Sequence, residues 1–200
     1  SDPEPVLWLV QIALGSPGGR QDAAETVRRY AARTAARPGL DDAIAGLLLE
    51  DAGDAVAALQ RYRASFTADP LRLAVAQRLY ALEPAAGRPA RLLPPIKAAI
   101  ARDARLDEYQ NLAGILLAES GRTAEAVPYF RRAVDLDPDN ARFAANLGGA
   151  LARLERWKEA AEAYARALEI APAAPTALKL GSTLRRLGRL DEALGAFERA

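Results

Sequence analysis

Small apolar, aromatic and proline residues recur along this chain at a fixed spacing. The stretch "EDAGDAVAALQRYRASFTADP" covers residues 50–70, and "ESGRTAEAVPYFRRAVDLDP" covers residues 119–138. Their matching Gly, Ala, aromatic and Pro positions are displaced by 68 residues, which is twice 34. A fixed period of this length indicates one structural unit that is used several times in succession.

A step of 34 residues, taken in both directions from residue 107, divides the chain into repeats. The last repeat begins at residue 174 because one residue is lost before it. The repeats that begin at residues 107, 141 and 174 agree best with one another, whereas those from residues 5 and 73 are degenerate. The predicted organisation is a single array over residues 1–200, with repeats at about 5–38, 39–72, 73–106, 107–140, 141–173 and 174–200, the last one truncated.

The order of small and large residues predicts two closely packed helices in each repeat. A glycine on the first helix and a facing alanine on the second permit close approach, and an aromatic ring one turn further along fills the wider space. The three sets are Gly114, Ala126 and Phe130; Gly148, Ala160 and Tyr164; and Gly181, Ala193 and Phe197. The chain is therefore predicted to be all-α.

Glycine and proline mark the predicted helix ends. Gly121 and Gly188 can adopt a positive φ with little strain, so we expect them to end the first helix of their repeats. Pro138 and Pro172 follow the second helix, where a residue with a fixed φ and no N–H stops it.

Three further prolines predict local irregularity. If the second helix of the repeat from residue 107 begins near Thr123, Pro128 lies in its second turn and should bend the helix or delay its start. Pro94 occupies the same place one repeat earlier and is followed by Pro95. The least regular helix is therefore expected within residues 73–106.

This pattern resembles the tetratricopeptide repeat (TPR) family, whose unit is a helix, a turn and a second antiparallel helix. The resemblance covers most of the chain and is most specific from residue 107 onward. It implies an all-α fold in which tandem helical hairpins form a right-handed α-α superhelix, with the first helices along its concave face. The function it implies is non-catalytic protein binding.

Composition limits the chemistry. The chain has no Cys and no His, so the usual zinc ligands and the usual general base are absent, and no metal or cofactor site is predicted. No nucleophile-elbow or phosphate-binding loop occurs either, and the chain is not expected to be an enzyme. The 27 basic and 26 acidic residues give a net charge of +1, which provides no field to attract nucleic acid.

Residues 6–14, "VLWLVQIAL", are the only continuous apolar run near the start, and the run is too short to insert across a bilayer. We interpret it as a buried helix, and we interpret Trp8 and Trp157 as packing residues. Because the chain begins with Ser1 and stops at Ala200 within a helical pattern, we interpret it as an excised piece of a longer protein. Its compartment is left open between the cytoplasm, taken as the default, and the periplasm.

In TPR proteins a ligand meets fixed positions of the first helices, and the resemblance implies which residues occupy them here. The predicted partner-binding residues are Leu47, Gln77, Glu108, Asn111, Ile115, Asn146, Arg142, Arg153, Lys179, Arg185 and Arg186. The face is apolar in the early repeats and rich in arginine in the late ones. One hypothesis is that the late end receives an acidic stretch of an extended peptide through Arg forks, while Asn111 and Asn146 hold its backbone. The alternative is that these are ordinary solvated charges.

The predicted function is a scaffold that binds a partner peptide or protein. The alternatives are a regulatory or substrate-presenting region of a larger enzyme, such as a glycosyl- or sulfo-transferase, and a periplasmic assembly or export factor. Richness in Ala and Arg suggests a bacterial source. Chaperone-tail binding is not indicated, because no repeat pairs the Lys and Asn that hold a terminal carboxylate. Leu194 and Phe197 on the truncated last helix predict self-association.

Overall fold

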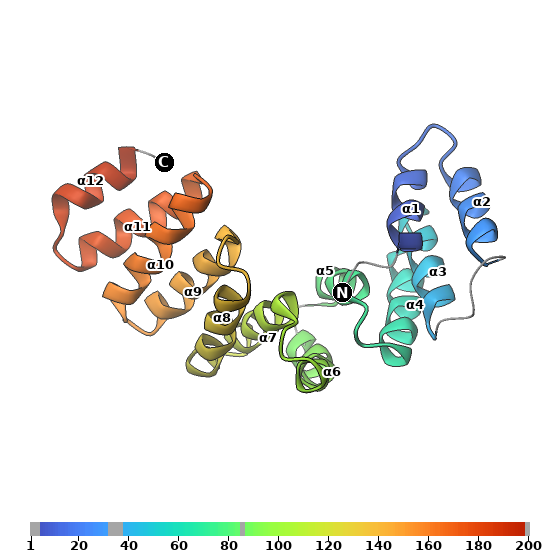
Figure 1. Cartoon of the computed structure of the whole chain (residues 1–200), viewed down its shortest axis with the longest axis horizontal. Coiled ribbons are helices and arrows are strands. Elements are labelled where there is room, and N and C mark those ends of the chain that lie inside the picture. The colour runs from blue at the N-terminus through green and yellow to red at the C-terminus, as the bar shows by residue number, and fades with distance from the viewer. Residues whose placement is uncertain (1–4, 32–37, 85–86, 199–200) are drawn as a thin grey trace. The chain divides into compact units, whose positions relative to one another are not determined.

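A computed structural model describes residues 5–31, 38–84 and 87–198, and within these ranges the chain is α-helical without strands (Figure 1). The helices are α1 (Pro5–Leu14), α2 (Arg20–Ala31), α3 (Leu40–Asp51), α4 (Ala55–Ala68), α5 (Leu73–Leu82), α6 (Arg88–Arg102), α7 (Asp107–Glu119), α8 (Thr123–Leu136), α9 (Ala141–Arg153), α10 (Trp157–Ile170), α11 (Ala174–Arg186) and α12 (Leu190–Glu198). The prediction of an all-α fold is confirmed.

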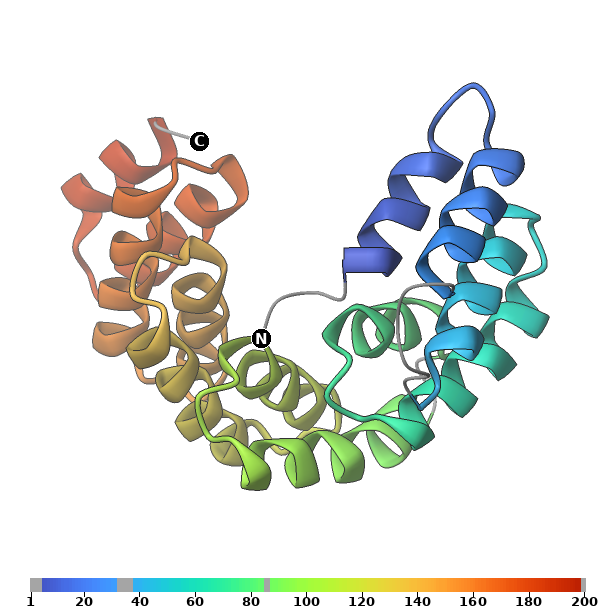
Figure 2. The same ribbon diagram turned by 45° about the vertical axis from the view of Figure 1, so that its right-hand side comes forward.

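The chain forms two compact units, residues 1–95 and residues 96–200, and each is described here by itself. In the first unit, α1 packs on α2, α3 packs on α4, and α4 contacts α5. In the second unit, α7 and α8, α9 and α10, and α11 and α12 form successive hairpins (Figure 2). The second helix of one hairpin contacts the first helix of the next, as α8 does with α9 and α10 with α11.

The first helices of the second unit follow the spacing of the sequence repeat. α7 begins at Asp107, α9 at Ala141 and α11 at Ala174, so the starts are separated by 34 and 33 residues. In the first unit, α3 and α5 begin at Leu40 and Leu73. The assignment of residues 1–200 to a single array stays a prediction, because the two units are described separately.

In α3, α7, α9 and α11 a glycine lies against the aromatic ring of its hairpin. A Cβ atom added at Gly148 would stand 2.8 Å from Cδ1 of Tyr164, and one at Gly114 would stand 2.7 Å from Cε1 of Phe130. This corrects the sequence interpretation, which set the alanine opposite the glycine and moved the ring one turn away. The ring itself fills the volume that a side chain at the glycine would need.

The predicted helix ends at glycine are present in the backbone. Gly121 and Gly188, which follow α7 and α11, have φ values of 77° and 74°. The corresponding residue after α9 is Glu155, which adopts the same left-handed conformation with a φ of 58°. The turn geometry is therefore kept where the sequence has lost the glycine, at some cost in backbone strain.

The prolines do not delay the helices that contain them. α8 begins at Thr123 with Pro128 inside it, and α6 runs for 15 residues from Arg88 with Pro94 and Pro95 inside it. Of the two expected effects, the late start is therefore wrong, and the bend stays a prediction. Each proline lacks the N–H of one helical hydrogen bond, and the residues on both sides of it continue the helix.

A buried carboxylate joins three helices of the first unit. Glu83, which ends α5, is 1% exposed and accepts hydrogen bonds from Arg63 Nε at 2.6 Å and Arg63 Nη2 at 2.9 Å. Arg91 Nη1 of α6 lies 3.2 Å from Glu83 Oε2, and Arg88 donates to the Glu83 carbonyl oxygen. The hydrogen bonds from Arg63 hold the pKa of the Glu83 carboxyl below its ordinary value, although burial opposes them.

We predict opposite effects for alanine at two adjacent glycines of α9. Gly148→Ala should lower the free energy of unfolding by about 1–3 kcal/mol, because its Cβ would overlap the Tyr164 ring. Gly149→Ala should raise it by about 0.5–1 kcal/mol, because its Cβ meets only Tyr164 Oη at 3.5 Å and alanine favours the helix. Urea unfolding followed by circular dichroism measures both variants. Equal effects of the two substitutions would contradict the glycine–ring contact.

We predict a pH-dependent loss of stability for Glu83→Gln. Because the folded-state pKa of Glu83 lies below the unfolded value near 4.5, its contribution is complete above pH 4.5 and disappears as the pH falls through the folded-state pKa. The variant should be less stable than the parent by about 1–2 kcal/mol at pH 7, with the difference shrinking below pH 4.5. Chemical unfolding at several pH values measures this. A difference that stays constant down to pH 3 would assign the effect to packing instead of charge.

Candidate functional site

The first helices of the second unit are joined by polar contacts between residues about one repeat apart. Asn146 Nδ2 on α9 donates to Asn111 Oδ1 on α7 at 2.8 Å, and Arg142 forms an ion pair with Glu108. At the far end of α9, Arg153 Nη1 reaches the Ala118 carbonyl oxygen at 3.5 Å. These contacts fix the side chains of α9 relative to α7 on the surface that we call the first-helix face.

Two pockets open on the first-helix face. Pocket A has a volume of about 260 Å³ and is lined by Ile115, Ala118, Glu119, Phe130, Ala145, Asn146, Gly149, Ala150, Arg153 and Lys179. Pocket B has a volume of about 380 Å³ and is lined by Ala152, Trp157, Tyr164, Leu178, Lys179, Ser182, Thr183 and Arg186. Lys179 on α11 belongs to both.

Pocket B is the counterpart of pocket A in the next repeat. Each of its residues except Trp157 stands 33 or 34 residues after a residue of pocket A, in the pairs Ala118 and Ala152, Phe130 and Tyr164, Ala145 and Leu178, Asn146 and Lys179, Gly149 and Ser182, Ala150 and Thr183, and Arg153 and Arg186. The repeat that builds the hairpins therefore also builds a series of similar pockets.

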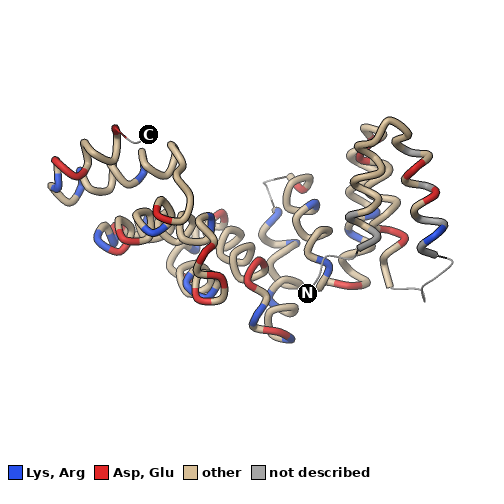
Figure 3. The backbone as a smooth tube through the Cα atoms, turned by 45° about the horizontal axis from the view of Figure 1, so that its top comes forward, with Lys and Arg blue, Asp and Glu red and all other residues tan. Residues whose placement is uncertain are grey.

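The cations of the two pockets are available to a ligand. Within the part of the chain that the structure describes, Arg153, Lys179 and Arg186 form no ion pair with a carboxylate, whereas Arg142 is paired with Glu108. Charges of both signs are otherwise interspersed along the helices (Figure 3). Burial raises the pKa of the Tyr164 hydroxyl, in the lining of pocket B, above its ordinary value, and the positive charge of Arg153 opposes this only in part. An anionic group would gain more here than at neutralised surface positions.

The equivalent place in the first unit is filled by the protein itself. Leu47, Tyr62 and Arg78 line a cavity of only about 10 Å³ together with residues of α1. Arg78 Nη1 is paired with Glu50 Oε1 at 2.8 Å, and the Tyr62 hydroxyl donates to Glu50 Oε2 at 2.7 Å. Burial and the carboxylate of Glu50 raise the pKa of Tyr62 well above its ordinary value. As far as the described residues show, Arg78 is neutralised here and the cavity is too small for a ligand group.

The structure separates the eleven predicted site residues into groups. Five of them lie together around the two pockets: Ile115, Asn146, Arg153, Lys179 and Arg186. Glu108 and Arg142 neutralise each other, and Asn111 is 1% exposed and positions Asn146. Arg185 is exposed on α11 and lines neither pocket.

The other two predicted residues belong to the first unit. Leu47 is 6% exposed and contributes to the small cavity behind α1, so it provides little contact area. Gln77 is exposed on α5. Neither is placed at the two pockets.

Sequence reasoning missed two apolar residues of pocket B. Leu178 is 50% exposed on α11 and lines pocket B, although it is not among the predicted partner-binding residues, which on α11 are the charged Lys179, Arg185 and Arg186. Trp157 was interpreted as a packing residue, yet its ring also lines pocket B, where the Arg186 guanidinium lies 5.7 Å from the ring centroid. The side chain of Trp8 lies outside the described residues.

Other chemistries find no support in the described ranges. Among those residues there is no group of three or more His, Cys, Asp or Glu placed to share a metal ion. None of the helices described has both the length and the apolar character that crossing a membrane requires.

Comparisons with known proteins agree with this architecture. A model of the tetratricopeptide repeat family matches residues 111–175. The protein CTR9 homolog of Arabidopsis thaliana is 39% identical over 90 residues, which are 43% of this chain and 8% of that protein. The chain thus spans less than a tenth of the length of this relative.

Solved structures extend the similarity to most of the chain. A structure of MamA protein has a TM-score of 0.69 and 21% identity, covering 82% of this chain and 90% of that one. TTC0263, a TPR protein of Thermus thermophilus, has a TM-score of 0.61 and 20% identity, with coverages of 81% and 89%. YrrB has a TM-score of 0.63 and 18% identity, with coverages of 80% and 84%. Residues 111–175 therefore match the tetratricopeptide repeat family, and the described helices share the α-α hairpin fold of these solved structures.

Proposed function

We propose that this chain is a non-catalytic scaffold that binds an extended segment of a partner protein on the first-helix face of its second unit. The observation that carries this proposal is the pair of equivalent pockets, A and B, whose cations have no internal carboxylate partner in the described ranges. Repeat packing alone accounts for hollows at equivalent places, so the support for a ligand comes from the convergent polar groups that line them.

The charge of the two pockets favours an acidic partner segment. Arg153 and Arg186 present planar guanidinium groups that form paired hydrogen bonds with a carboxylate, and Lys179 adds a point charge between them. Asn146, held in place by Asn111, retains a carbonyl oxygen that accepts a hydrogen bond from a peptide N–H. These groups together suit an extended backbone with acidic side chains.

The structural neighbours support the general class of function. YrrB is a TPR protein with an unusual peptide-binding site. Its fold is shared by this chain, and we carry over to the proposal only the use of the fold as a peptide-binding surface.

Charge reversal tests the proposal. A random dodecapeptide display selection against the whole chain should enrich peptides that contain Asp or Glu. The double variant Arg153→Glu with Lys179→Glu should weaken binding of the enriched peptides by about 100-fold, because each site loses an attractive charge and gains a repulsive one. Fluorescence anisotropy with labelled peptides measures this.

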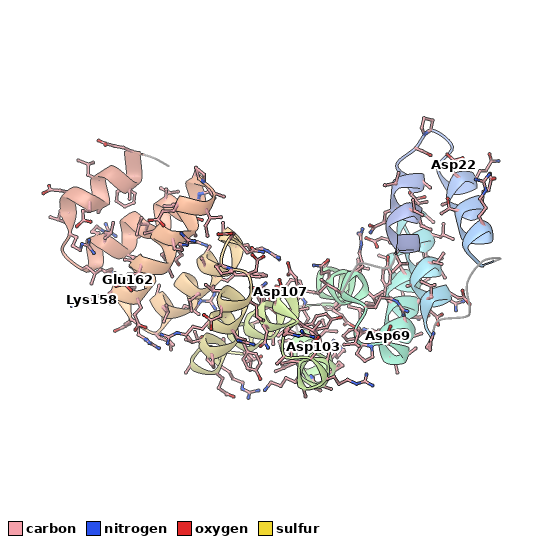
Figure 4. The ribbon with its side chains drawn as sticks, in the orientation of Figure 1. Asp22, Asp69, Asp103, Asp107, Lys158 and Glu162 are labelled. Atoms are coloured by element: carbon pink, nitrogen blue, oxygen red, sulfur yellow. The ribbon has the colours of Figure 1, made fainter. Side chains whose placement is uncertain are left out.

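A matched control separates local contacts from the general field. Lys158 is exposed on α10 and lines neither pocket (Figure 4). Lys158→Glu changes the net charge by the same amount as Lys179→Glu and should change the affinity by less than about threefold at physiological salt. Equal losses for the two single variants, or undiminished binding by the double variant, would remove the support for this face.

We propose in addition that the chain self-associates through α12. Leu190, Leu194 and Phe197 are exposed by 63%, 60% and 37%. In α8 and α10 the residues equivalent to Leu194 are Val127 and Ala161, and both are buried. In α1, a first helix, Leu9 and Ile12 are exposed, so a second copy offers an apolar helix of the kind that covers α8 and α10.

Sedimentation equilibrium tests this second proposal. The parent chain should show a mass that rises with concentration, and Leu194→Lys should shift the equilibrium toward the monomer by about tenfold, because the buried apolar contact would be replaced by a charge. A parent chain that stays monomeric at high concentration would refute the proposed contact.

A further inference from the structure

We propose that the two pockets recognise different side chains of one segment: pocket A takes a carboxylate, and pocket B takes an aromatic or large aliphatic group. This inference rests on the proposed function and names the chemistry of its ligand. It follows from differences between two pockets that occupy equivalent places in the repeat.

Pocket A is the more polar of the two. Arg153, Lys179 and Asn146 provide donors, and Glu119 is the single acidic residue of its lining, so the charged side chains leave the pocket with a net charge of +1. Its remaining walls are Ile115, Phe130 and alanines of α7 and α9. A carboxylate entering here gains charged hydrogen bonds from Arg153 and Lys179 on facing helices.

Pocket B is walled by larger apolar groups. Trp157, Tyr164 and Leu178 line it. Tyr164 matches Phe130 of pocket A and Leu178 matches the small Ala145, whereas Trp157 has no counterpart in the lining of pocket A. The hydroxyl of Thr183 donates to the Lys179 carbonyl oxygen at 2.7 Å and is therefore occupied within α11. The Arg186 guanidinium lies over the Trp157 ring, and both side chains line pocket B. The lining suits an apolar group that is covered by a guanidinium.

A glycine without a packing role keeps pocket A open. Gly149 is in the interior of α9, where glycine destabilises a helix by about 1 kcal/mol relative to alanine. Gly148 needs to be glycine because of the Tyr164 ring, but a Cβ at Gly149 would make only an ordinary contact of 3.5 Å. The equivalent residues are Ile115 and Ser182. Glycine at position 149 therefore leaves space in pocket A, and helix packing in the described residues does not require it.

The spacing of the two pockets sets the spacing of the recognised residues. Neighbouring helices pack at about 8–10 Å, and an extended chain advances by about 3.3 Å per residue. One repeat along the face therefore corresponds to about three residues of an extended segment. The ligand class is a segment in which an acidic residue and a bulky apolar residue are two to three positions apart, with Lys179 between their pockets.

The experiment fills each pocket separately in the full chain. Gly149→Leu places a side chain in pocket A, and Ser182→Leu does the same at the equivalent position of pocket B. Ala124→Leu is the control, because Ala124 is exposed on α8 and lines neither pocket. Thermal unfolding checks that all three variants fold. The probes are fluorescein-labelled display-selected dodecapeptides, each made also with Asp or Glu changed to the amide and with the apolar residue changed to Ala.

The expected result is a pocket-specific pattern. Gly149→Leu should weaken binding of the selected peptides by about tenfold. In this variant, changing Asp or Glu of the peptide to the amide should cause no further loss of affinity. In Ser182→Leu, by contrast, changing the apolar residue of the peptide to Ala should cause no further loss of affinity. Ala124→Leu should match the parent chain in every titration.

Two other results would overturn the inference. If both filled variants bind like the parent, or if the sensitivities are exchanged between the pockets, the assignment of side chains is wrong. The proposed function would still stand in either case, provided that the Arg153→Glu and Lys179→Glu double variant weakens peptide binding as expected above. If the double variant also binds normally, the proposed function itself fails.

Discussion

The structure of the hairpins depends on the contact between a glycine of the first helix and the aromatic ring of its partner helix, which is present in four of the described hairpins, those that begin with α3, α7, α9 and α11. At Gly114, Gly148 and Gly181 the ring occupies the volume in which a Cβ would stand. This contact sets how closely the two helices approach, and the residues around it are buried alanines and leucines. Since the hairpins are alike, each one presents the same surface to the next, and stacking repeats that surface along the chain.

The same contact links packing to the candidate site. Phe130 and Tyr164, which pack on glycines, also line pockets A and B, so the core ring of each hairpin forms part of the wall of a pocket. Pocket shape is therefore set by packing, which tolerates little change. The character of each pocket is set by rim residues such as Gly149, Ser182 and Leu178, which packing leaves free to vary. This division allows consecutive repeats to hold different ligand groups without loss of the fold.

The first unit shows what happens when the rim positions are used for stability. Its equivalent of pockets A and B is closed by Leu47 and by the network of Glu50, Arg78 and the Tyr62 hydroxyl. Nearby, Glu83 is buried and held by Arg63 and Arg91. These charged residues of the first unit are therefore paired internally, while Arg153, Lys179 and Arg186 in the second unit are not paired within the described residues. Equivalent positions of the hairpin thus differ between the two units in whether their charges are neutralised.

The sequence by itself determined the helical hairpins, because the 34-residue recurrence of glycine, ring and proline has few physical explanations other than repeated close packing. It also placed Arg153, Lys179 and Arg186 on one face, since the face follows from helical position alone. Only the tertiary structure decided which of the predicted partner-binding residues are accessible to a ligand. Arg142 is neutralised by Glu108, and Leu47 is covered by α1. Both facts depend on neighbours that are distant in sequence. The pockets, and the space left by Gly149, likewise arise between helices from different repeats, where no local pattern could show them.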